Sequence, residues 1–248
     1  MKKIHGIVTG AGKGIGLSVV KKLLSENYSI TAITRSKSIE LENLKKKKIN
    51  SLNIVYLDLN KIEEVSEEFK KIIKLKPSEF LINNAGIRSR YPLLKMSSET
   101  LFKVMNNNFM SAFLITKEYI KNIKKNKSTN HSIISVTSIV GPQGFSELSS
   151  YAASKGALEA SMKSLAIEYG NKNIRINCVA PGFVKTSYYD DFKKNNPKLY
   201  KWTIEKTPMK RWGNVEEVAN VVEFLVSEKS SFITGSTIFV DGGWTAGS

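Results

Sequence analysis

The sequence has few of the side chains that form cross-links or metal centres. Its 248 residues include one cysteine, Cys178, and two histidines, His5 and His131. A single thiol excludes an internal disulfide, and these three side chains cannot supply the four ligands of a structural zinc site. The scarcity of cysteine fits a reducing compartment. We therefore expect a cytoplasmic protein without a bound metal.

Long hydrophobic runs are also missing. No stretch approaches the roughly 18 apolar residues that indicate a membrane span. The segment Met1–Thr9 begins with lysines and continues with apolar residues, as a signal peptide does. Its apolar part is too short, and glycines follow it rather than a cleavage site. The segment therefore predicts a first β-strand, and we expect no membrane partner.

Acidic residues are scarce relative to basic ones, with 22 Asp and Glu against 38 Lys and Arg, and the formal net charge is +16. A balance of this kind raises the possibility of a nucleic-acid partner. Only five of the basic residues are arginines, however, and the lysines are scattered over predicted helices. Specific base readout relies mainly on Arg, and no nucleic-acid-binding motif is present. We expect no nucleic-acid partner.

Short β-branched runs alternate with longer helical patterns along the whole chain. This alternation is typical of a parallel sheet with helices on both faces. The sequence predicts an α/β fold: a single doubly wound, Rossmann-type domain over residues 1–248 with a mostly parallel seven-stranded sheet. The predicted strands are Ile4–Thr9, Ser29–Thr34, Asn53–Leu57, Phe80–Asn83, Ser132–Thr137, Ile174–Val179 and Thr237–Val240. The predicted helices include Ile15–Ser25, Ile62–Leu75, Phe109–Lys125, Tyr151 to about Tyr169, and Val215–Val226.

Ligands of such sheets bind beyond the carboxyl ends of the strands. Residues just after Thr9, Thr34, Asn83, Thr137 and Val179 are therefore expected to converge.

Tyr151 and Lys155 are four residues apart on a predicted helix, so they lie on one face. A cation about 4 Å from the phenol, at an effective dielectric constant of ~20, contributes about 4 kcal/mol. That is enough to lower a tyrosine pKa from ~10 towards ~7. Pairs of this kind arise by chance on many helices, so the meaning of this one depends on the other motifs.

A glycine-rich turn follows the first predicted strand. It reads Thr9-Gly10-Ala11-Gly12-Lys13-Gly14-Ile15-Gly16 and leads into a helix, with the pattern T-G-x-x-x-G-x-G. Glycines let the backbone approach a pyrophosphate, which then lies at the positive end of the helix. The turn predicts a dinucleotide site.

The end of the second predicted strand indicates which dinucleotide. In NAD-binding proteins of this fold an acidic residue there binds the ribose hydroxyl. Here the stretch Ile33-Thr34-Arg35-Ser36 contains no acid. Arg35 is placed to bind a 2′-phosphate through its fork, and Lys13 adds a second cation. We predict NADP(H) as the cofactor.

With these motifs the sequence resembles the short-chain dehydrogenase/reductase family from Lys3 to about Trp244. Asn83-Asn84-Ala85-Gly86 resembles the N-N-A-G of that family, and Asn108 lies five residues before Phe113, as its asparagine does. Ser138 precedes Tyr151 by 13 residues, and Pro181-Gly182 follows the sixth strand. All of these matches occur in the order and spacing of the family.

The resemblance implies a role for each matched residue. Tyr151 would exchange a proton with the substrate oxygen, which Ser138 also binds. Lys155 would lower the tyrosine pKa and bind the nicotinamide ribose, and Asn108 would position a proton-relay water. The implied cofactor contacts are Thr9, Gly10, Gly12, Lys13, Gly14, Ile15, Gly16, Thr34, Arg35, Ser36, Asp58, Leu59, Asn84, Ala85, Gly86, Tyr151, Lys155, Pro181, Gly182, Val184 and Thr186.

The substrate class stays open between two readings. The ending from Thr207 to Gly243 resembles 3-oxoacyl-acyl-carrier-protein reductases, and equally many sugar and polyol dehydrogenases. The carrier-docking arginine of those reductases is replaced near Ala166-Ile167. The expected substrate lid, at about 183–206, is longer than theirs and rich in aromatics. A non-catalytic NADP-binding regulator is an alternative of another class.

Arg88 and Arg90 follow the N-N-A-G motif at the rim where substrates enter, in a chain that otherwise prefers lysine. Because guanidinium forks suit carboxylates and phosphates, we expect one of them to bind an anionic group of the substrate. Ser138, Gln143 and Tyr151 are the other candidate substrate contacts. The family also implies a homotetramer, packed through the helices Asn108–Lys125 and Tyr151–Tyr169 and through the C-terminal strand.

Overall fold

The structure, a computed structural model, describes residues 3–123 and 130–247. Its centre is a seven-stranded parallel sheet with the order β3-β2-β1-β4-β5-β6-β9. The strands are β1 His5–Thr9, β2 Ser29–Thr34, β3 Leu52–Tyr56, β4 Phe80–Asn83, β5 His131–Val136, β6 Ile174–Pro181 and β9 Thr237–Val240. The predicted doubly wound fold is confirmed.

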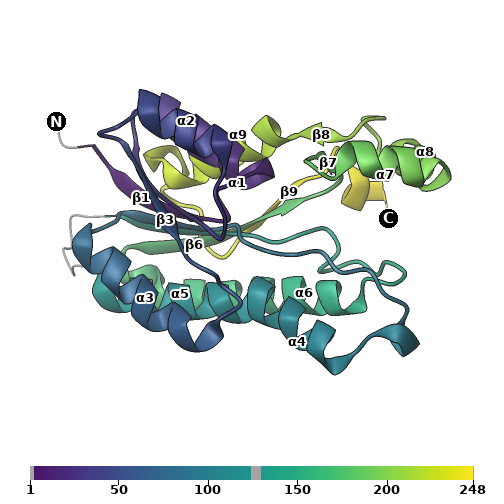
Figure 1. Cartoon of the computed structure of the whole chain (residues 1–248), viewed down its shortest axis with the longest axis horizontal. Helices are drawn as coiled ribbons and strands as arrows, with labels where there is room; N and C mark the ends of the chain where they lie inside the picture. The colour runs from purple at the N-terminus through teal and green to yellow at the C-terminus, as the bar shows by residue number, and fades with distance from the viewer. Residues whose placement is uncertain (1–2, 124–129, 248) are drawn as a thin grey trace.

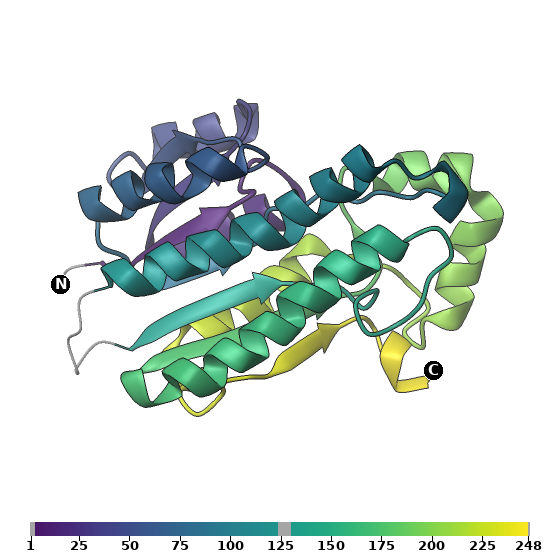
Figure 2. The same cartoon turned by 90° about the horizontal axis from the view of Figure 1, so that it is seen from below.

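Helices cover both faces of the sheet (Figure 1). One layer contains α1 Gly14–Ser25, α2 Ile39–Lys47 and α9 Val215–Val226. The opposite layer contains α3 Ile62–Leu75, α4 Ser98–Met105, α5 Ser111–Asn122 and α6 Ser149–Tyr169. Figure 2 shows the arrowheads of the central strands pointing towards the side of α7 Tyr189–Asn195 and α8 Pro197–Lys206.

The central strands are buried along their whole length, as a sheet covered on both faces requires. Their side chains alternate between two cores. One core packs Val8, Ile30 and Ile82 against α1 and α9, and the other packs Ile7 and Leu81 against α3, α5 and α6. Continuous β-branched runs in the sequence therefore correspond to strands with no solvent face.

The helix predicted over Phe109–Lys125 differs at both ends. Residues Asn106–Met110 form a π-helical turn, η2, and α5 begins only at Ser111. The turn widens the backbone where the side chains of Asn107 and Asn108 are buried. The predicted end, Lys125, lies outside the described residues, and α5 ends at Asn122. π-turns of this kind are frequent at functional sites.

The helices α7 and α8 rest on a cluster of aromatic side chains. Trp212 packs against Phe183, Phe192 and Tyr200, with ring centroids 5.2–5.8 Å apart. Its indole N–H donates to Thr203 Oγ1 at 2.7 Å. A two-stranded sheet of β7 Val184–Lys185 and β8 Gly213–Asn214 joins the segment to the body of the molecule. None of the helices in residues 3–123 and 130–247 has the length and apolar composition needed to cross a bilayer.

Candidate active site

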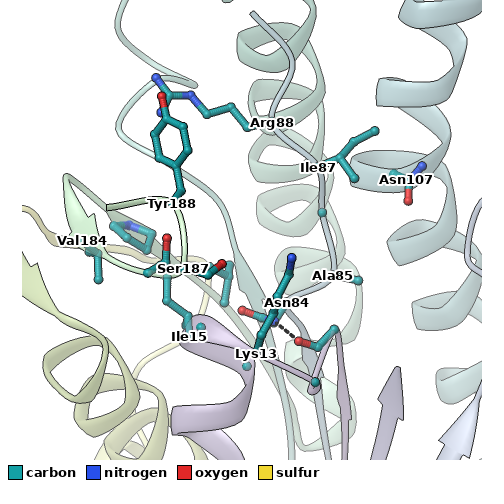
Figure 3. Close-up of a pocket in the computed structure, with 18 of the residues that line it drawn as sticks. Lys13, Ile15, Asn84, Ala85, Ile87, Arg88, Asn107, Val184, Ser187 and Tyr188 are labelled. Carbon is teal, nitrogen blue, oxygen red and sulfur yellow. Dashed lines mark hydrogen bonds between the residues drawn. The ribbon is translucent and has the colours of Figure 1, made fainter. Parts of the chain in front are cut away.

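A cavity of about 1210 Å³ lies at the carboxyl edge of the sheet (Figure 3). This exceeds the roughly 300–1,000 Å³ of ordinary small-molecule pockets, so there is room for a dinucleotide together with a small substrate. Residues after β1, β2, β4, β5 and β6 meet there, as the rule for parallel sheets predicts.

The glycine-rich turn forms one wall of the cavity. Gly10 and Gly14 have φ values of +64° and +54°, which favour glycine. A Cβ at Gly10 would lie 2.7 Å from the Ala85 Cα, and one at Gly12 would lie 2.6 Å from Thr34 Oγ1. The α1 N-cap residue, Lys13, makes no side-chain capping bond, so the first N–H groups of α1 are left for a ligand. This wall fits a pyrophosphate.

Thr9 supports the turn from behind and does not line the cavity. Its hydroxyl accepts from the backbone N–H groups of Asn84 and Ala85, at 3.0 and 3.2 Å. The Asn84 amide in turn donates to the carbonyls of Thr9 and Gly10, both at 3.1 Å. These bonds hold the ends of β1 and β4 together, so Thr9 positions the residues expected to contact the cofactor.

Arg35, Ser36 and Lys37 line the cavity beyond β2, with Asp58 after β3. Burial opposes ionisation of Asp58, but hydrogen bonds from Asn60 and the charges of Arg35 and Lys61 lower the pKa of its carboxyl group. An ionised acceptor and several cations thus share this end of the cavity. The arrangement suits an adenine amine beside a phosphate.

Ser138, Tyr151 and Lys155 meet at the other end, where β5 ends and α6 begins. The Lys155 ammonium is buried and donates to the Val136 carbonyl at 2.7 Å. It lies 6.0 Å from the centre of the Tyr151 ring. Burial lowers the pKa of Lys155 to about 8. The neighbouring Ser138 hydroxyl, as a hydrogen-bond partner of the phenol, lowers the pKa of Tyr151.

Burial raises the pKa of the Tyr151 phenol above its usual value, while the hydrogen bond from Ser138 and the positive charge of Arg88 lower it. The Lys155 ammonium is bonded to the Val136 carbonyl and burial lowers its own pKa, so the predicted effect of Lys155 on Tyr151 stays a prediction.

Asn108 is completely buried and lies behind the cavity wall. Its Oδ1 accepts from the Ile87 N–H at 2.7 Å, and its Nδ2 donates to the Ile87 carbonyl and to Ser154 Oγ at 2.9 and 3.0 Å. The side chain is therefore engaged with protein partners. A Cβ at Gly86 would lie 3.1 Å from Asn108 Oδ1 and 3.4 Å from Lys155 Nζ, so these groups are neighbours.

Pro181, Gly182, Val184 and Thr186 line the wall that follows β6. The Pro181 carbonyl accepts from the Ile139 N–H at 3.2 Å, which carries β6 two residues past its predicted end. A Cβ at Gly14 would lie 3.5 Å from the Thr186 methyl group, so this wall faces the glycine-rich turn.

The other three candidate substrate residues, Arg88, Arg90 and Gln143, make different contacts. Arg88 lines the cavity, and its guanidinium lies 5.2 Å from the centre of the Tyr188 ring. Arg90 also reaches the rim, but it pairs with Glu147 at 3.4 Å. Gln143 lies outside the cavity lining, and its Oε1 accepts from the Trp244 indole at 3.0 Å.

Several lining residues were missed from the sequence, among them Ile87, Asn107, Phe145, Ser187 and Tyr188. Figure 3 shows Arg88 extending alongside Tyr188 at the mouth. The aromatic richness of 183–206 was a signal for Tyr188, but which ring faces the cavity depends on how α7 packs. Within residues 3–123 and 130–247 there is no group of three His, Cys, Asp or Glu side chains suited to a metal ion.

A doubly wound parallel sheet with a glycine-rich turn and a Ser–Tyr–Lys group at opposite ends of one cavity defines the class of dinucleotide-binding oxidoreductases. The family described as enoyl-(acyl carrier protein) reductase matches residues 10–245 of the chain. The curated relatives of this chain include the 3-oxoacyl-[acyl-carrier-protein] reductase FabG of Buchnera aphidicola, which is 38% identical to it over 248 residues, or 98% of each chain. The FabG of Thermotoga maritima is 34% identical over 96% of each.

Solved structures agree with this likeness. A provisionally assigned 2-deoxy-D-gluconate 3-dehydrogenase of Agrobacterium tumefaciens with bound NADP has a TM-score of 0.91, with 26% identity, 99% coverage of this chain and 98% of its own. A 4-hydroxyisoleucine dehydrogenase mutant with NADH and succinate has a TM-score of 0.91, with 29% identity and 98% coverage of each chain. The chain belongs to the short-chain dehydrogenase/reductase family and is an oxidoreductase.

Proposed function

We propose that the protein uses NADP(H) to interconvert a carbonyl group and a secondary alcohol of a small substrate. The observation that carries this is a single cavity with a pyrophosphate cradle at one end and Ser138, Tyr151 and Lys155 at the other. The proposal is supported by the close packing of the glycine-rich turn, since a Cβ at Gly10 would collide with Ala85 and one at Gly12 with Thr34 Oγ1. Arg35, Lys13 and Lys37 place cations at the adenosine end, where a 2′-phosphate needs them.

Bound NADP(H) would supply or accept the hydride. The protein's own residues bind and orient the substrate and move the proton. Tyr151 donates its proton to the carbonyl oxygen, or removes one from the alcohol, because its hydroxyl faces the cavity beside Ser138. Ser138 holds the same oxygen through a hydrogen bond. Lys155 lies one helical turn away and binds the nicotinamide ribose, while Asn108 supports the wall through Ile87.

Two substrate classes have support. The curated FabG relatives, at 34–38% identity, favour a 3-oxoacyl thioester. The structural neighbours provisionally assigned as gluconate dehydrogenases favour a sugar acid or a polyol. A panel of acetoacetyl thioesters, keto-sugars and simple diketones, assayed with NADPH and the purified protein, separates these classes. Tight NADPH binding without turnover of any compound would contradict the proposed function.

Three further properties belong to the same proposal. Residues 183–206, with α7 and α8, form a substrate lid, supported by the position of Ser187 and Tyr188 on the cavity. The protein is a homotetramer, supported by exposed apolar side chains on α4 and α6 such as Phe102 and Ile167. Its location is the cytoplasm, supported by the use of a single, buried cysteine.

A further inference from the structure

The charges around the cavity are distributed unequally. The acidic side chains that line it within the described residues, Glu40 and Asp58, come from the segments after β2 and β3, at the adenosine end. Around Tyr151 the charged lining residues are Arg88, Arg90 and Lys155, all cationic. The space in which a substrate would react therefore has a positive potential, which favours an anionic ligand.

The two arginines at this end are in different electrostatic situations. Arg90 is half exposed and pairs with Glu147, so its charge is already compensated. No carboxylate of residues 3–123 or 130–247 lies within 4.0 Å of the Arg88 guanidinium. Arg88 instead lies over the ring of Tyr188, the residue that precedes α7. A guanidinium stacked on an aromatic ring keeps its edge N–H groups available for a second partner.

The backbone leading to Arg88 is held in place. Both backbone polar groups of Ile87 are bonded to the buried amide of Asn108, at 2.7 and 2.9 Å. Tyr188 holds the other end of the Arg88 side chain. Arg88 is itself exposed, but a fork that is held at both ends loses less conformational freedom on binding than an unrestrained one. Arg88 is also near enough to Tyr151 for its charge to act on the phenol.

We propose that Arg88 and Tyr188 form a carboxylate-binding subsite, and that the substrate is a small oxo or hydroxy acid whose carboxylate lies a few bonds from the reacting carbon. This rests on the proposed function and adds the substrate class. The guanidinium fork binds both oxygens of a carboxylate. A neutral acyl thioester would leave the subsite without its ligand.

Matched pairs of anionic and neutral substrates test this subsite. With NADPH, kcat/KM is measured for 2-oxobutanoate and 2-oxobutanamide, 3-oxobutanoate and 3-oxobutanamide, and 4-oxopentanoate and 4-oxopentanamide. Each amide keeps the size and the ketone but removes the charge. The wild-type protein is expected to prefer the carboxylate in at least one pair. In Arg88→Gln that preference falls roughly 10- to 150-fold, the range of a hydrogen bond to a charged group.

Two further variants distinguish a direct contact between Arg88 and the carboxylate from a general effect of positive charge at this end of the cavity. Arg90→Gln is expected to change both members of a pair by the same factor, since its partner is Glu147. An effect of Arg88→Gln through the acidity of Tyr151 shows as a shift of the pH profile for the amide, whereas loss of the contact lowers kcat/KM selectively for the carboxylate. Tyr188→Ala frees the Arg88 side chain and reduces the preference for the carboxylate without abolishing it. NADPH binding, unchanged in all three variants, verifies their fold.

The outcomes are distinct. The lack of a wild-type preference for the carboxylate in any pair, or equal effects of Arg88→Gln on both members, would overturn the subsite and leave the proposed oxidoreductase intact. Turnover of a neutral diketone such as 2,3-butanedione establishes in the same experiment that the protein is active. No turnover of any compound despite NADPH binding would overturn the proposed function, and the subsite with it.

Discussion

At the scale of single residues, burial has more influence on the pKa values of the site side chains than their spacing in the sequence does. Tyr151 and Lys155 are one helical turn apart, and the ammonium is bonded to the Val136 carbonyl, while the charge of Arg88 lowers the pKa of the phenol. Desolvation acts on both groups and moves their pKa values in opposite directions. The acidity of Tyr151 in the working enzyme therefore depends on what occupies the cavity.

Replacing Tyr151 by Phe removes the proposed proton donor and little else. We expect NADPH binding within a factor of about two of the wild type and a fall in kcat of roughly 10²- to 10⁴-fold, the usual contribution of a general acid. Fluorescence titration and steady-state rates measure the two quantities. Tyr56→Phe, whose exposed hydroxyl donates only to Glu42, is the matched control and should keep full activity. Near-normal turnover by Tyr151→Phe would contradict the proposed role.

Arg35 is expected to select NADP(H). Arg35→Asp removes a cation and places an acid where a ribose hydroxyl would bind, so the ratio of kcat/KM for NADPH to that for NADH should fall at least 10-fold and reverse. Lys46→Asp makes the same change of charge at an exposed position of α2 and should leave the ratio unaltered. A wild-type protein more efficient with NADH would refute the argument.

His5 links pH to stability. Burial, followed by the charge of Lys76, lowers the pKa of its imidazole from 6.5 to about 4, and the ring bonds to Ser29 and Thr31, each at 3.2 Å. The unfolded chain binds a proton near pH 6.5 while the folded protein does not, so stability falls as the pH drops from about 6.5 to 4. At pH 4.5 the loss from this group is on the order of 2–3 kcal/mol.

Urea unfolding at pH 7 and pH 4.5 measures that loss. His5→Gln keeps a polar side chain that cannot titrate, so its stability should fall less over the same interval. An equal fall in both proteins would assign the effect to other groups, of which His131, whose pKa burial also lowers, is the first to test.

At the scale of elements, the turn from β1 into α1 is the most constrained part of the site. Gly16 lies in the first turn of α1, and a Cβ there would collide with the Gly10 carbonyl and the Asn84 amide. The helix can therefore approach the strand ends only because position 16 has no side chain. The same closeness lets the helix N-terminus face the cavity.

We expect Gly16→Ala to destabilise the protein by about 1–3 kcal/mol, the usual cost of overpacking, and to weaken NADPH binding by at least 10-fold. Thermal unfolding and fluorescence titration provide the measurements. Gly170→Ala is the matched control, because its backbone is helical and a Cβ there would meet nothing within 4 Å. A Gly16→Ala protein with wild-type binding would show that the turn does not hold the cofactor.

At the scale of the whole molecule, α6, one of the helices that the family resemblance assigns to subunit contacts, carries an exposed apolar side chain, as does the neighbouring α4. Phe102 on α4 is 64% exposed and Ile167 on α6 is 87% exposed. Ala157, Ala160 and Ser164 follow one face of α6 at helical spacing, which permits close approach of a second helix. Such a surface is costly to leave in water.

Light scattering should accordingly give about four times the chain mass of 27.7 kDa at micromolar concentration. Ala160→Arg places a charged side chain on the small face and should shift the mass to dimer or monomer. Ser25→Arg, at the exposed end of α1, should not change it. A monomeric wild-type protein would count decisively against the tetramer.

Local patterns in the sequence were sufficient for the architecture. Strands of a covered sheet need runs of apolar residues, and helices need apolar residues at helical spacing, so β2, β4, β9, α3 and α9 have the bounds that were predicted. The dinucleotide turn could be predicted for a similar reason. Close contacts with neighbouring segments require glycines there, and these glycines lie close together in the sequence, where they form a recognisable pattern.

Contacts between segments far apart in the sequence decided where the side chains of the site point. Asn108 is bonded to Ile87 and Ser154, Gln143 to Trp244, and Arg90 to Glu147, across separations of 21 to 101 residues. Arg88, at the cavity, lies over the ring of Tyr188, which is 100 positions further along the chain. The direction of a loop side chain, and the solvation that sets its pKa, depend on which distant segments surround it. No local pattern contains that information, and it emerges only when the chain is folded.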